Sequence, residues 1–154
     1  MKYRHIILSL ALGLIALIAL HAFHSFAYDH YRIRWMSLMV LAGNYPSAYI
    51  NTYIGLTSLI YLIVLRMNRS PLITQPRIYA LPAFSLCFGI YLCIWCLGES
   101  AEGWLDYCRG TGAPLRDAMA DLAMSIGAAL HAAHIGAFYA LCSLIIILFS
   151  RNHE

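Results

Sequence analysis

Residues 122–149, LAMSIGAALHAAHIGAFYALCSLIIILF, decide the fold, because they contain no Asp, Glu, Lys or Arg. One helix needs roughly 20 apolar residues to cross a hydrocarbon core about 30 Å thick, and this run is longer than that. Backbone N–H and C=O groups inside lipid have no water to bond with, so the run must satisfy them internally as a helix. The stretch therefore predicts a transmembrane helix.

Three similar runs precede it, at residues 6–26, 48–67 and 78–97, and Arg66 is the one charged residue within them. The whole chain of 154 residues is 62% hydrophobic and 11% charged, whereas soluble domains carry about 25% charged residues. The sequence predicts an all-α, multi-pass integral membrane protein. Its single domain, residues 1–154, is expected to be an antiparallel four-helix bundle in the lipid bilayer.

The charges outside these runs predict which side of the membrane each end faces. Basic residues are enriched in cytoplasmic connections, and one side of the predicted bundle carries Lys2, Arg4, Arg66, Arg69, Arg77 and Arg151. The other side carries Arg32, Arg34, Arg109 and Arg116, together with every acidic residue except Glu154. We therefore expect both termini to be cytoplasmic.

The start of the chain also fits a secretory signal. Lys2 and Arg4 precede the apolar run 6–20, and the small residues Ser25 and Ala27 follow it as a cleavage site would. Cleavage would leave three helices. The apolar character continues beyond the run to residue 26, which favours a retained first helix.

The five cysteines do not indicate a disulfide framework, because four of them lie in predicted helices, where cysteine behaves as a small hydrophobe. Cys93 and Cys96 have the C-x-x-C spacing of a redox pair, which also arises by chance in a cysteine-tolerant helix. Cys108, in an outer loop, is expected to be the most accessible thiol. A dispersed net charge of +3 does not indicate binding to nucleic acid.

The predicted outer loop, residues 98–120, holds most of the charge and leads into a polar stripe on the last helix. Carboxylates there could form an acid–base site for a lipophilic substrate, of the isomerase or cyclase type, with a histidine as the base. A solvated acidic loop is the alternative interpretation. The candidate catalytic residues are Asp121, His131, Glu99, Glu102 and Asp117.

Two His-x-x-His pairs predict a different chemistry. In an antiparallel bundle the pair on the first helix lies at about the depth of the pair on the last, and imidazoles so placed could bind a transition metal or haem. Contacts with headgroups, or with a carbonyl of a neighbouring helix, are the alternative. The candidate metal ligands are His21, His24, His131 and His134.

The last helix also carries a series of glycines and alanines, residues that let membrane helices approach closely. This face predicts tight packing within the bundle, self-association or contact with a partner membrane protein. The small residues are Gly127, Ala128, Ala132, Ala133, Gly136, Ala137 and Ala140.

Several local patterns give the chain a resemblance to a known family. The patterns are Tyr3-Arg-His before the first helix, Asn51-Thr-Tyr entering the second, YLIVLR closing it at residues 61–66, and a small-residue last helix that ends in Arg151. With four helices and a cysteine in a long polar third loop, the sequence resembles fungal MARVEL-type membrane proteins. The histidine pairs and the apolar stretch 35–42 depart from that pattern.

The resemblance implies a non-catalytic bundle that organises a membrane, acts in apposition or trafficking, or serves as an accessory subunit. The sequence ranks this scaffold or accessory role first. A membrane-embedded acid–base enzyme ranks second, and a subunit that binds haem or a metal ranks third.

Overall fold

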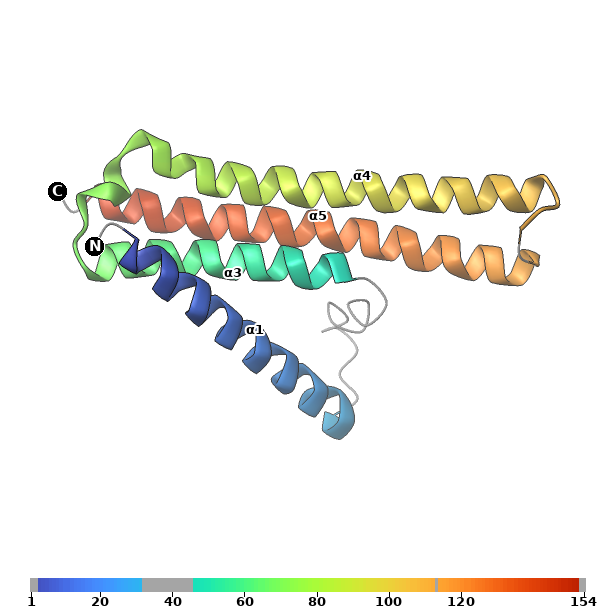
Figure 1. The fold of residues 1–154 in the computed structure, drawn as a ribbon, viewed down its shortest axis with the longest axis horizontal. Coiled ribbons are helices and arrows are strands. Elements are labelled where there is room, and N and C mark those ends of the chain that lie inside the picture. Colours follow the sequence, from blue (N-terminus) through green and yellow to red (C-terminus); the bar gives the residue numbers. More distant parts are fainter. Residues whose placement is uncertain (1–2, 32–45, 113, 153–154) are drawn as a thin grey trace.

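The computed structural model describes residues 3–31, 46–112 and 114–152, and its regular structure over these residues is entirely helical. Four α-helices are long and apolar enough to cross a membrane. In chain order the elements are α1 Arg4–Tyr31, α3 Pro46–Met67, the short 3₁₀ helices η1 Pro71–Thr74 and η2 Pro76–Tyr79, α4 Ala80–Cys108 and α5 Leu115–Arg151 (Figure 1).

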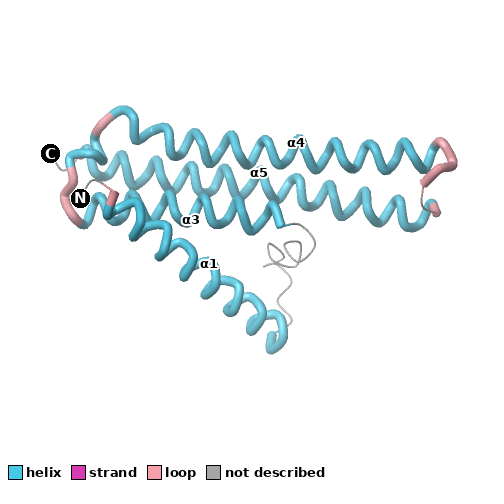
Figure 2. The backbone as a smooth tube through the Cα atoms, in the orientation of Figure 1, coloured by secondary structure: helices cyan, strands magenta, loops and turns pink. Residues whose placement is uncertain are grey.

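Helices α4 and α5 form a long hairpin, and the shorter helix α3 packs beside α5 along the part of the hairpin nearer η1 and η2 (Figures 1 and 2). Helix α1 packs against α3 near its own start and then diverges from the other helices (Figure 1). The two ends of the chain lie at the end of the molecule that holds η1 and η2, opposite the hairpin tip. Among the described residues, α1 makes no comparable contact with α4 or α5.

Helices α4 and α5 approach each other closely at two glycines, Gly89 and Gly136, which face each other. A Cβ atom added at Gly136 would lie 2.8 Å from the carbonyl oxygen of Ser85 and 3.0 Å from the Cα of Gly89. A Cβ atom added at Gly89 would lie 2.8 Å from the carbonyl oxygen of Ala132. The two backbones are therefore in direct contact, as the small-residue pattern of the last helix predicts.

Helix α3 packs against α5 at its middle and near its C-terminal end. The ring of Tyr139 occupies the space where a side chain at Gly55 would lie. Near the turn between α3 and α4, an apolar cluster connects α3, α5 and the two 3₁₀ helices. It consists of Leu62, Leu65, Ile73, Ile78 and Ile147, all buried.

Two polar contacts accompany the packing of α1 on α3. The Tyr53 hydroxyl donates to the carbonyl oxygen of Leu10 at 3.1 Å, and the Tyr49 hydroxyl lies 3.0 Å from Nδ1 of His21. At Gly13 the helices are so close that an added Cβ would overlap the side chain of Thr57. The contact between α1 and α3 therefore also depends on a glycine.

Each of the four helices extends beyond its predicted apolar run at one end or at both. The predicted outer loop 98–120 is mostly helical, because α4 continues to Cys108 and α5 begins at Leu115 after Pro114. Backbone hydrogen bonds of a helix do not require apolar side chains, so α4 stops only at a turn in which Gly110 has φ +73°. Thr111 N–H then bonds to the carbonyl of Asp106, which satisfies a terminal carbonyl of α4.

Helix α3 ends with the same hydrogen-bonding pattern but without a glycine. Ser70 N–H bonds to the carbonyl of Leu65, and Arg69 takes the left-handed position with φ 48°. An L-residue in this conformation costs roughly 1 kcal/mol. Pro71 and the Ser70 hydroxyl, which accepts from Leu72 N–H, then begin η1.

Gly136→Ala is expected to destabilise the protein by about 1–3 kcal/mol, because the added methyl group meets backbone atoms that can move only with the whole helix. Gly127→Ala is the matched control on the same helix, where an added Cβ has nothing within 4 Å. Thermal unfolding in detergent should show a lower Tm for Gly136→Ala and an unchanged or higher one for Gly127→Ala. Equal effects would show that the close approach of α4 and α5 does not limit stability.

Candidate functional site

The four carboxylates proposed as catalytic lie on the α4–α5 hairpin toward its tip. Because Gly89 lies opposite Gly136, Glu102 on α4 falls at about the level of Ala123 on α5, close to the level of Asp121. Glu99 and Asp117 extend the same acidic band on the two helices. The continued helix α4 therefore brings these acids into one region, although each of the four side chains is exposed.

The hydrogen bonds of this acidic band are those of a solvated surface. Glu99 accepts from the indole N–H of Trp95 at 3.1 Å, one turn before it on α4. Asp106, nearer the tip, lies 3.8 Å from Arg109, and both side chains are exposed. These surroundings do not hold any of the acids in a buried position, where a carboxylic acid would be kept protonated for catalysis.

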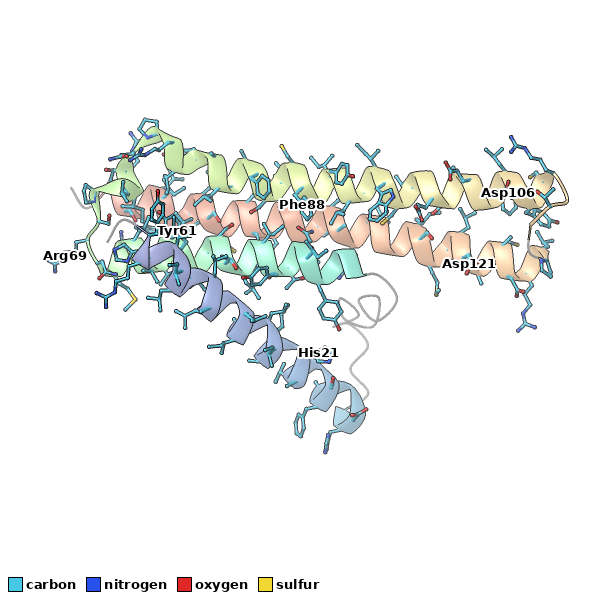
Figure 3. The ribbon with its side chains drawn as sticks, viewed as in Figure 1. His21, Tyr61, Arg69, Phe88, Asp106 and Asp121 are labelled. Atoms are coloured by element: carbon cyan, nitrogen blue, oxygen red, sulfur yellow. The ribbon has the colours of Figure 1, made fainter. Side chains whose placement is uncertain are left out.

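His131 lies apart from the carboxylates. It is half-buried, and its Nε2 atom is buried without a hydrogen-bond partner among the described residues. Asp121 is ten residues earlier on the same helix, which is about 15 Å along the axis. Direct proton transfer needs about 3 Å between heavy atoms, so His131 is not within reach of Asp121. Figure 3 shows Asp121 on α5, toward the tip of the hairpin.

The described histidines have separate surroundings. His21 on α1 pairs with the Tyr49 hydroxyl, and His134 is exposed, with Nδ1 2.7 Å from the carbonyl oxygen of Leu130 in its own helix. Among the described side chains, no group of three or more His, Cys, Asp or Glu residues is placed to hold a metal ion. The side chain of His24 lies outside the described part, so the four-histidine site stays a prediction.

All five cysteines are free thiols. Cys96 is buried and Cys93 half-buried, on successive turns of α4, and Cys108 is exposed at the end of that helix. The C-x-x-C pair is thus packed inside the helix layer. Cys108 is exposed, and so is Cys87 on the same helix, so the expectation that Cys108 is the most accessible thiol stays a prediction.

Asn51 has a larger role than the sequence indicated. Its side chain is 1% exposed, and its amide Nδ2 donates to the carbonyl oxygen of Ala132 at 3.0 Å, so that it links α3 to α5. The signal that could have found it is a single amide in an apolar run, because an amide in such a run needs a partner on a neighbouring helix.

Comparison with known proteins adds no relative: no family model, curated protein or solved structure matches the chain.

Asn51→Ala is expected to lower stability by about 0.5–2 kcal/mol, the range for a polar contact between membrane helices. Asn68→Ala is the control, because the Asn68 amide, just after α3, bonds to the carbonyl of Val64 in the last turn of that helix and not to another helix. Unfolding curves in detergent should separate the two variants. A Tm for Asn51→Ala equal to that of Asn68→Ala would show that the bond between α3 and α5 contributes nothing.

Proposed function

We propose that this protein is a small multi-pass membrane protein that organises a membrane or assists a partner there, as a scaffold or accessory subunit. One observation carries the proposal: the α4–α5 hairpin is longer than the hydrocarbon core of a bilayer and bears its acidic residues toward the tip. Helices of 29 and 37 residues measure about 44 and 56 Å, against a hydrocarbon core of about 30 Å. The surplus forms a polar projection outside the membrane.

The hairpin has the properties of a rigid projection. Its two backbones touch at Gly89 and Gly136, and small buried residues continue the contact toward the tip at Cys96, Ser100 and Ala118. Around this seam the tip exposes both acidic side chains and large apolar ones, among them Leu105 and Met119. A surface of mixed chemistry on a stiff support suits contact with another protein.

In the proposed topology the helices cross the bilayer as an antiparallel bundle, with both termini on the cytoplasmic side. The support comes from the arginines at the end that holds η1 and η2, because basic residues favour the cytoplasmic face. The hairpin tip, with Cys108, is then on the opposite side. The likeness to fungal MARVEL-type proteins agrees with this arrangement and remains a proposal.

A second candidate, the acid–base enzyme, is favoured by the buried, unpartnered Nε2 of His131. A ring nitrogen in this position could accept a proton from a lipophilic substrate that reaches it from the bilayer. The distance to Asp121 means that such an enzyme would use His131 without that carboxylate.

Cys108 should react with a membrane-impermeant maleimide only from the side opposite the chain termini, since it is exposed at the end of α4. Sealed vesicles of known orientation, with a tag at the amino terminus, provide the measurement. Cys96 is the internal control, because its buried thiol should react only after unfolding. Labelling of Cys108 from the same side as the tag would contradict the proposed topology.

Rescue of cells that lack the gene separates the two candidate functions. A scaffold that uses its tip should lose function when four charges are removed together in E99Q/E102Q/D117N/D121N, and should tolerate H131A. An enzyme that depends on His131 should lose function in H131A alone, with normal insertion shown by Cys108 labelling. Full rescue by the four-charge variant would overturn the scaffold proposal.

A further inference from the structure

The end of the molecule that holds η1 and η2 carries a concentration of positive charge, here called the basic end. Every described Asp and Glu lies elsewhere: Asp29 is near the diverging end of α1, and the others are on the hairpin. Figure 3 shows Arg69 and Asp106 at opposite ends of the molecule. The basic end consists of Arg4, Arg66, Arg69, Arg77 and Arg151, all exposed.

Two of these arginines are held in place by contacts between helices. Nη1 of Arg66, in the last turn of α3, donates to Oγ of Ser150 at 2.8 Å. Nη1 of Arg151, the next residue on α5, donates to the Tyr79 hydroxyl at 3.0 Å. Each guanidinium has five N–H donors in a planar fork, so these bonds leave most of the donors available to an external acceptor.

Arg69 and Arg77 place two further charges beside this pair. Arg69 is held at the left-handed position that ends α3, and Arg77 lies in η2, which begins with Pro76. Neither side chain has an ion pair or hydrogen bond among the described residues. Both charges are therefore carried on turns whose backbone is fixed by proline and by terminal hydrogen bonds.

Large apolar side chains are exposed close to these arginines in the sequence. Met67 follows Arg66 and is 79% exposed, and Leu148 and Phe149 precede Ser150 and are 53% and 61% exposed. Cations next to exposed apolar surface match a ligand that has an anionic group and hydrocarbon chains in one molecule. A free anion would use the charges and leave the apolar residues uncovered.

We propose that the basic end binds the headgroups of anionic phospholipids. Arg66 and Arg151 donate to the phosphate oxygens, Arg69 and Arg77 add electrostatic attraction, and the acyl chains cover Met67, Leu148 and Phe149. Guanidinium forks suit phosphate oxygens geometrically as well as by charge. The proposal concerns lipid contact and does not depend on the scaffold role.

The test uses the full chain in a neutral detergent, titrated with phosphatidylglycerol or phosphatidylcholine, with bound lipids counted by native mass spectrometry. The wild type should prefer phosphatidylglycerol by at least about 25-fold, because each arginine near an anionic headgroup contributes about a fivefold gain and Arg69 and Arg77 are two of them. In R69N/R77Q the affinity for phosphatidylglycerol should fall by about 25-fold. Asn is chosen at position 69 because it tolerates a positive φ.

The matched control, R109Q/R116Q, removes the same charge from the hairpin and should bind phosphatidylglycerol like the wild type. Thermal unfolding of each variant without added lipid shows whether it is folded. Equal affinity for the two lipids, equal loss in both double variants, or unchanged binding by R69N/R77Q would each overturn the proposal. Displacement of the lipid by inorganic phosphate at equal concentration would identify a site for a small anion instead.

Discussion

The fold depends on the direct contact between the backbones of α4 and α5 at Gly89 and Gly136. A hydrocarbon environment gives apolar helices little reason to associate, because lipid tails solvate leucine as well as another helix does. Association must come from close packing, and glycine allows the closest packing. The same contact fixes the register of the hairpin, and α3 is then added through Tyr139 over Gly55 and the amide of Asn51.

Hydropathy predicted the existence of the helices but not their ends. The reason is visible in α4, which continues past Gly98 through charged residues to Cys108 and ends where Gly110 adopts a positive φ. An apolar run indicates that a segment lies in an apolar environment, whereas the ends of a helix are set by backbone hydrogen bonds and turn residues. On the small-residue face of the last helix, Ala132, Gly136 and Ala140 are buried, whereas a Cβ added at Gly127 has no neighbour within 4 Å and Ala137 is exposed, so only part of this face packs against another helix.

The candidate site was predicted less completely, for a geometric reason. Periodicity shows which residues share a helix face, but it does not show how far apart they lie along the helix axis. Asp121 and His131 share a face and yet lie far apart along α5. An antiparallel arrangement predicts the depth of the histidines. It does not predict the angle at which α1 diverges from α3, and the ring of His21 lies next to the Tyr49 hydroxyl. The role of Asn51 required knowledge of which helix lies beside it, which one sequence does not contain.

Among the described helices α1 packs mainly on α3, which bears on the order in which the helices assemble. Helices α4 and α5 are consecutive in the chain and joined by a tight turn, so their contacts form between neighbouring segments soon after synthesis. Helix α1 is made first but finds its described packing surface only on α3, and it has no comparable contact with the hairpin. Because α3 is the next described helix after α1, this pair can form before the α4–α5 hairpin is complete. A change confined to the face of α1 on α3 would release α1 without disturbing the hairpin.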